Sequence, residues 1–221
     1  MKTPLRYQLT QFDCGPTSML NALSFLLERE EIPSEVLKYV YAIMVDRNHG
    51  PQRPGGTSEA AMRFFAEWLN DCHERIGLPI EARHLHGNQV SITEGSEIVQ
   101  WVEQKGIAIL SCFLCGSDHY VLLDGFERDE SGQIRYARLF DPFYLDEGEA
   151  FAPGGRFYGL KDELTFVSGE PFSCNRRVSV HLMEACEKCH YSLICNTPRE
   201  ATLLRRCDRD GEKRIENGRP V

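Results

Sequence analysis

The 221-residue sequence lacks a long apolar run, a block of basic residues and a tract of low complexity. No window approaches the roughly 18 apolar residues of a membrane-spanning helix, so we expect no membrane span. Residues 1–15 lack the apolar core of a signal peptide, which predicts a cytoplasmic location. The 25 basic residues are outnumbered by 33 acidic ones, for a formal charge of −8. We therefore expect neither nucleic acid nor an anionic membrane as a partner.

A disulfide framework is also unsupported, although cysteine is abundant. The chain contains nine cysteines. An odd number, in a sequence without an export signal, favours free thiols, a metal site or catalysis over paired disulfides. Hydrophobic residues make up 42% of the chain and aromatic residues 10%, which is enough for one sizeable core.

The first part of the chain has the apolar spacing of helices. One helix begins directly behind Cys14, with Pro16 at the first helical position. Ser34 is a suitable N-cap for a second helix, and Thr57 or Ser58 for a third. The predicted helices cover residues 16–30, 34–46 and 57–71.

The pattern changes near Leu78, from helical spacing to short alternating or apolar runs. Helices followed by antiparallel strands predict an α+β fold, with a helical N-terminal half packed on an antiparallel β-sheet. We expect one main domain over residues 1–168 and a cysteine-rich extension over 169–221 that ends in a polar, mobile tail. The predicted strands cover residues 78–87, 106–114, 119–127, 134–141 and 155–160, with one helix over 94–106.

Cys14 is the first candidate for chemistry. The positive end of a helix dipole favours the thiolate form of a cysteine, which is the nucleophile. Gly15 leaves the neighbouring backbone open to a substrate carbonyl, and Gln8 has the reach to donate to an oxyanion, whereas Gln11 turns more easily to solvent. A lone cysteine before a helix is nevertheless more often a core residue, so partners have to support the catalytic interpretation.

His119 and Asp141 are the expected partners. His119 begins an apolar strand after a turn, where a sheet can aim an imidazole at a helix terminus. Asp118 and Asp124 are excluded as its orienting acid, because odd separations on a strand point to opposite faces. Asp141 ends the next strand, and antiparallel pairing would return it to the side of His119. An aspartate before Pro142 also suits a plain turn, and that alternative stays open.

These segments, "QxxxxDCGPTSML", "HYVLLDGF" and "LFDP", resemble those of the bacteriocin-processing, double-glycine-leader peptidases, a branch of the papain-like cysteine peptidases. The resemblance covers roughly residues 5 to 145. It implies a papain-like fold with the nucleophile at the start of a central helix. It also implies that Cys14 is the nucleophile, His119 the general base, Asp141 its orienting acid and Gln8 the oxyanion donor. Members of that family are typically joined to membrane transporters, and no transporter segment is present in this sequence.

The expected activity is hydrolysis of a peptide or amide through a thioester acyl-enzyme, without a cofactor. An acyltransferase with the same residues, or a catalytically idle peptide-binding module on the same scaffold, are the alternatives. The second C-x-x-C pair and His190 match a haem-attachment pattern, which the missing export signal disfavours. Two C-x-x-C pairs are also zinc-ligand candidates, against the simpler interpretation as unligated thiols: Cys112, Cys115, Cys186 and Cys189.

Overall fold

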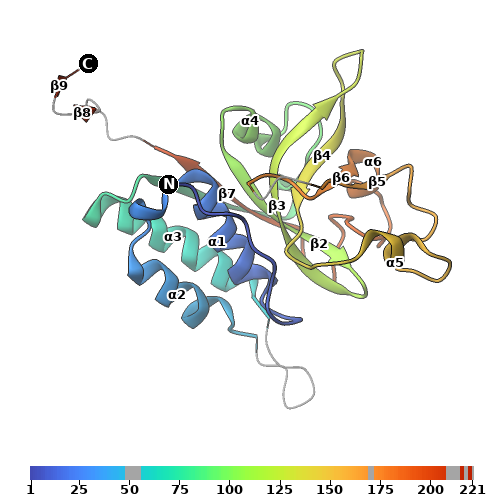
Figure 1. The fold of residues 1–221 in the computed structure, drawn as a ribbon, viewed down its shortest axis with the longest axis horizontal. Helices are drawn as coiled ribbons and strands as arrows, with labels where there is room; N and C mark the ends of the chain where they lie inside the picture. The colour runs from blue at the N-terminus through green and yellow to red at the C-terminus, as the bar shows by residue number, and fades with distance from the viewer. Residues whose placement is uncertain (48–55, 169–171, 208–214, 217–218, 221) are drawn as a thin grey trace.

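The computed structural model describes residues 1–47, 56–168, 172–207, 215–216 and 219–220. In this part of the chain, seven strands form one open antiparallel sheet in the order β1-β7-β2-β3-β4-β6-β5 (Figure 1). A separate two-stranded pairing joins β8 to β9. The mixed α+β class expected from the sequence is confirmed.

Helices α1, α2 and α3 come before the first strand, and strands and short helices are interspersed after them. The helical elements are α1 Cys14–Leu26, η1 Arg29–Glu31, α2 Ser34–Met44, α3 Glu59–Ile76, η2 Gly87–Gln89, α4 Glu97–Glu103, α5 Glu147–Phe151 and α6 Val180–Met183. The strands are β1 Ile80–His86, β2 Ile107–Leu114, β3 Ser117–Arg128, β4 Ile134–Phe140, β5 Leu164–Phe166, β6 Arg176–Ser179, β7 Glu200–Arg206, β8 Ile215–Glu216 and β9 Arg219–Pro220. Among these described helices, every one is too short or too polar to cross a lipid bilayer.

The sheet has an apolar core on each face. Alternation along β3 divides its side chains: Tyr120 and Leu122 pack with α1, α2 and α3, whereas Val121 and Leu123 pack with α4, α5 and α6. Burying a side chain of this size stabilises the fold by about 1.5–3 kcal/mol. Because both faces are covered, the central strand β2 is buried along most of its length and is almost entirely apolar.

The helix starts largely follow the expected capping residues. Ser58 caps α3, where its Oγ accepts a hydrogen bond from the backbone N–H of Ala61 at 3.1 Å. The expected cap Ser34 is wrong by one residue, because it is already the first residue of α2 and Pro33 holds the extended cap position. Gly77 ends α3 with a left-handed φ of 73°, a conformation that glycine adopts without strain.

The strands expected around the site are all present, but the one expected over 155–160 is wrong. That stretch is a series of turns in which Gly159 has φ 85° and the buried Phe157 side chain anchors the chain to the core. Its alternation of apolar and small residues is that of consecutive turns rather than of a strand. The strand in this region comes later, as β5.

The boundary expected between residues 168 and 169 does not divide the sheet. β6 pairs with β4 and β5, and β7 lies between β1 and β2. The expected C-terminal extension is therefore corrected: through residue 207 it supplies structural strands of the same sheet. Most of the tail that we expected to be mobile lies outside the described residues.

Candidate active site

Cys14 is the first residue of α1, and only 7% of its surface is exposed. The helix is fixed against the sheet by Ser18, whose Oγ donates to the backbone oxygen of Tyr120 at 3.0 Å. Asn21, one turn further, holds the incoming chain: its side chain accepts from the backbone N–H of Arg6 and donates to its carbonyl, both at 2.9 Å. The thiol is thus placed at the positive end of a helix that cannot shift relative to β3.

His119 and Asp141 form the pair expected from the two neighbouring strands. Leu122 on β3 lies opposite Phe140 on β4, so Asp141, the next residue, comes back beside the start of β3. The Nε2 atom of His119 lies 2.7 Å from Oδ1 of Asp141. Both side chains are buried, with Asp141 fully so. Tertiary pairing therefore brings together two residues that are 22 positions apart.

The charges of this pair depend on each other and on Cys14. Burial disfavours the imidazolium, but the carboxylate of Asp141 and the hydrogen-bonded thiol of Cys14 outweigh it and raise the pKa of His119 to about 10. Since Nε2 is bonded to Asp141, Nδ1 is the ring nitrogen left for Cys14. Burial also opposes the ionised form of Asp141, yet its cationic neighbour His119 keeps the pKa of that carboxyl below the ordinary value. The arrangement supports an imidazolium paired with the Asp141 carboxylate.

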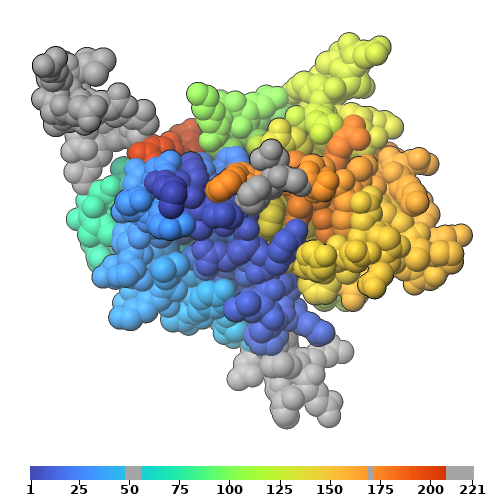
Figure 2. Space-filling view, viewed as in Figure 1, coloured from blue at the N-terminus to red at the C-terminus, as the bar shows by residue number. Residues whose placement is uncertain are grey.

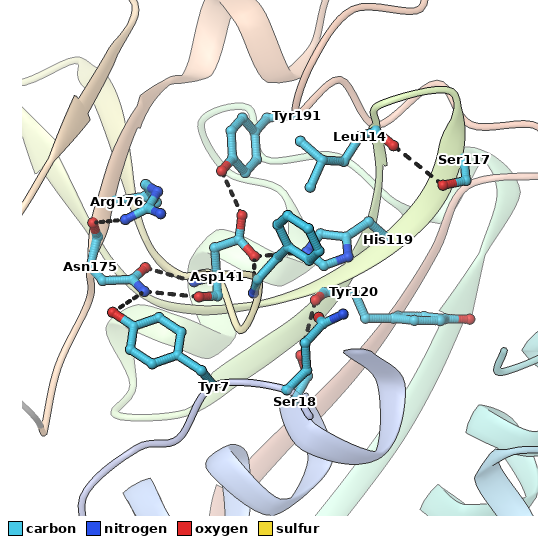
Figure 3. A network of polar contacts seen from close by, with 12 residues as sticks. Tyr7, Ser18, Leu114, Ser117, His119, Tyr120, Asp141, Asn175, Arg176 and Tyr191 are labelled. Carbon is cyan, nitrogen blue, oxygen red and sulfur yellow. Dashed lines mark hydrogen bonds and ion pairs between the residues drawn. The ribbon is translucent and has the colours of Figure 1, made fainter. Parts of the chain in front are cut away.

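Two residues from the C-terminal part of the chain complete the surroundings of Asp141 (Figure 3). Tyr191 donates its hydroxyl to Oδ2 of Asp141 at 2.6 Å. Asn175 accepts from the backbone N–H of Asp141 and donates to its carbonyl oxygen, both at 2.8 Å. The backbone N–H of Phe143 donates to Oδ1 at 2.8 Å. Sequence reasoning missed Tyr191 and Asn175, because neither belongs to a periodic pattern or to a motif near Cys14, His119 or Asp141.

Gln8 lies beside the thiol, in the segment that precedes α1. Its amide Nε2 donates to the backbone oxygen of Thr10 at 2.6 Å, and its buried Oε1 has no partner among the described residues. An amide nitrogen carries two hydrogens, so one remains for a ligand. Gln11 also borders the same cavity, but its side chain is exposed. The position of Gln8 agrees with the expected donor role, which stays a prediction.

Asp13 shapes the loop that carries Gln8. Its buried carboxylate accepts from the backbone N–H groups of Leu9 at 3.1 Å and Thr10 at 2.8 Å, and from the hydroxyl of Thr10 at 2.6 Å. These bonds fold residues 8–12 back over the start of α1. The aspartate of "DCG" is therefore a structural partner of the loop.

Gly15 has a different role from the one expected. A Cβ atom at this position would lie 2.1 Å from Oγ1 and 2.7 Å from Cβ of Thr57. Thr57 is itself fixed, because its hydroxyl donates to the backbone oxygen of Met44 at 2.6 Å. Glycine is thus needed for the close approach of the α3 N-terminus to α1, and the expected open path for a substrate carbonyl past Gly15 is wrong.

A cavity of about 210 Å³ opens in front of the thiol. Cys14 and Gln8 line it from the N-terminal side, His119 from β3, and Phe143 and Arg156 from the chain that follows Asp141. In the space-filling view the blue N-terminal segment borders the yellow segment after β4 (Figure 2). The cavity is large enough for a scissile group and a neighbouring side chain, with Cys14 at its wall.

The four zinc candidates do not come together. Cys112 is buried within β2, while Cys115 is exposed at the tip of a two-residue β2–β3 turn, with φ 54°. Cys186 is exposed and Cys189 half-buried, in the loop after α6. Among the described residues, no group of three or more histidine, cysteine, aspartate or glutamate side chains is arranged to hold a metal ion. The zinc hypothesis is therefore corrected to separate thiols, and burial raises the pKa of Cys112 well above its usual value.

Comparison of the chain with protein-family models, with curated proteins and with solved structures finds no match. What the site can do chemically is therefore inferred from its own geometry.

Proposed function

We propose that this protein is a papain-like cysteine peptidase or amidohydrolase, acting through a thioester on Cys14. One observation carries the proposal: His119 is hydrogen-bonded to the buried Asp141, and its ring shares with Cys14 the lining of a cavity at a helix N-terminus. The order is that of a triad, with a nucleophile, a base within hydrogen-bond reach and an acid that orients the base. The motif resemblance to the bacteriocin-processing peptidases agrees with it.

The first half of the reaction forms the acyl-enzyme. The Cys14 thiolate attacks the carbonyl carbon of a peptide or amide, and the carbonyl oxygen becomes an oxyanion. The Gln8 amide and the Cys14 backbone N–H are positioned as its donors, because the first N–H groups of a helix have no partner within the helix. The carbon–nitrogen bond then breaks, the leaving amine takes a proton from His119, and a thioester remains on Cys14.

The second half regenerates the enzyme. Neutral His119 takes a proton from water, the resulting hydroxide attacks the thioester, and the carbon–sulfur bond breaks to release a carboxylic acid. The Cys14 thiolate and the His119 imidazolium are restored. Asp141 holds the ring in one orientation throughout and stabilises its charge, since its second oxygen is bonded to Tyr191. An amine or thiol in place of water would make the same steps an acyl transfer.

The experiment is a digestion of a defined peptide mixture, with products identified by mass spectrometry. We expect cleavage by the wild-type protein, and a loss of about 10⁴-fold or more in Cys14→Ala and in His119→Ala. Cys186→Ala, which removes an exposed thiol outside the cavity, is the matched control and should cleave normally. Peptide binding without cleavage by wild type and Cys14→Ala alike would instead identify a binding module.

A further inference from the structure

Within the part of the chain that the structure describes, one cation that lines the proposed catalytic cavity has no acidic partner. Arg156 lines the cavity together with Cys14 and His119. Among the ion pairs of the described residues, none includes Arg156, although most of the other arginines that face a neighbouring element are paired with a carboxylate. The whole chain is acidic, at −8, so an unpaired guanidinium at this position is notable.

The guanidinium is held toward the site by aromatic stacking. Its carbon lies 5.1 Å from the centre of the Phe143 ring, within the range of a cation–π contact. Phe143 in turn meets the ring of His119 edge-on, with centroids 6.3 Å apart and an angle of 87°. Its backbone N–H is bonded to Asp141, so the stacking platform belongs to the same network as the triad.

The turn that carries Arg156 is tightly built. The backbone N–H of Phe157 donates to the oxygen of Ala150 at 2.8 Å, and the Phe157 side chain is fully buried. Gly155 approaches the end of α5 so closely that a Cβ would lie 2.3 Å from the carbonyl oxygen of Glu149. The backbone that carries Arg156 is therefore fixed, and the exposed residue lies at the edge of the cavity.

Asp118, the acidic residue that lines the same cavity, already has partners within the protein. Asp118 lies 3.8 Å from the guanidinium of Arg47, and its two oxygens accept from the backbone of Asn196 at 2.7 Å and the hydroxyl of Thr197 at 3.0 Å. Its charge is thus compensated within the protein. Apart from His119, whose charged form Asp141 stabilises, the charge left for a ligand in the cavity is that of Arg156.

We infer that Arg156 is an anion-binding subsite, and that the substrate carries a carboxylate close to the bond that Cys14 attacks. This inference rests on the proposed function, since it names the substrate class of that site. The guanidinium presents parallel N–H donors that match a carboxylate, and it stacks on the Phe143 ring beside the cavity. The carboxylate can belong to an acidic side chain or to a free C-terminus.

The first experiment compares alkylation of Cys14 by iodoacetate, an anion, with alkylation by iodoacetamide, its neutral counterpart, located by peptide mapping. We expect Arg156→Gln to lower the iodoacetate-to-iodoacetamide rate ratio about three- to tenfold, and 0.5 M NaCl to reduce the wild-type ratio. Arg156→Lys should retain part of the preference. Arg135→Gln makes the same charge change at an exposed position outside the cavity and should leave the ratio unchanged.

The second experiment separates the two sources of the carboxylate. Peptide pairs that differ only as glutamate or glutamine beside the cleaved bond, with amidated C-termini, test the side chain; pairs with free or amidated C-termini test the terminus. A preference for the acid that disappears in Arg156→Gln identifies the source. If Cys14 is reactive but the iodoacetate ratio is the same in wild type and Arg156→Gln, the subsite is refuted and the proposed function stands. A Cys14 that resists both reagents refutes the proposed function instead.

Discussion

Replacing Tyr191 by phenylalanine tests the environment of the triad at one atom. The substitution removes the hydroxyl that donates to Oδ2 of Asp141 at 2.6 Å and keeps the ring. The ring packs against Phe157, with centroids 5.7 Å apart, so the core contact is preserved. Asp141 is fully buried and its pKa lies below the ordinary value, which means that the variant leaves a buried, ionised oxygen without its donor.

The size of the expected loss in the free energy of unfolding follows from the charge on Asp141, which accepts this hydrogen bond. A hydrogen bond to an ionised group contributes about 1.5–3 kcal/mol, whereas one between neutral groups contributes about 1 kcal/mol. We therefore expect Tyr191→Phe to lower the free energy of unfolding at pH 7 by about 1.5–3 kcal/mol. For a domain of this size each kcal/mol shifts the melting temperature by about 2–4 °C, so Tm should fall by about 3–12 °C.

The assay is urea and thermal unfolding at several pH values, with Tyr136→Phe as the matched control. The hydroxyl of Tyr136 makes only a 3.4 Å contact with the backbone oxygen of Asp162 at the surface, so its loss should be close to neutral. Because the folded pKa of Asp141 is depressed, its stabilisation is present above the ordinary value of 3.8 and is lost as pH falls through the folded pKa. The difference between wild type and Tyr191→Phe should persist from pH 5 to 8 and shrink below pH 3.8. A loss of less than about 0.5 kcal/mol at pH 7 would refute the reasoning.

Other predictions concern the proposed oxyanion donor Gln8, the contact of Gly15 with Thr57, and the buried Glu200. Gln8→Ala should lower kcat about 100- to 1000-fold and Gln11→Ala much less; equal effects would contradict the choice of donor. Gly15→Ala should reduce the free energy of unfolding by about 1–3 kcal/mol in urea, with partial rescue by Thr57→Gly; wild-type stability would refute the contact. Burial raises the pKa of Glu200 to about 7, so its contribution to stability is present below its ordinary value of 4.5 and lost as pH rises through 7. Glu200→Gln should therefore be more stable than wild type at pH 8 and show no such gain at pH 4.5, and the absence of a difference between the two pH values would contradict this.

The positions of Cys14, His119 and Asp141 could be predicted because local rules govern them. A cysteine followed by glycine and proline marks a helix start, and strand alternation excludes Asp118 and Asp124 as partners of His119. Antiparallel pairing of successive strands then leaves Asp141 as the nearby acid. The helix start and the strand alternation depend on short sequence separations, and the pairing of two successive strands brings Asp141 to His119 across 22 positions.

The residues that hydrogen-bond to Asp141 could not be predicted, because their positions depend on where the C-terminal part of the chain returns to the sheet. Tyr191 meets Asp141 across 50 positions and Asn175 meets it across 34. Cysteine-rich composition suggested a separate extension, yet β7 inserts between β1 and β2, a choice made by packing rather than by propensity. The misassigned stretch 155–160 shows the same limit, since Phe157 is buried by a turn that alternation cannot distinguish from a strand.

The central claim is that Cys14 is a nucleophile activated by His119, and covalent labelling tests it most directly. The protein is treated at pH 6 with a peptide carrying a thiol-reactive group, and the label is located by peptide mapping. Burial raises the pKa of Cys72, Cys174 and Cys195, so these thiols should react slowly. We predict that the label is found on Cys14 and that His119→Ala slows its attachment about 100-fold or more. Labelling spread over exposed Cys115 and Cys186 with Cys14 unmodified, or a rate unchanged in His119→Ala, would contradict the account.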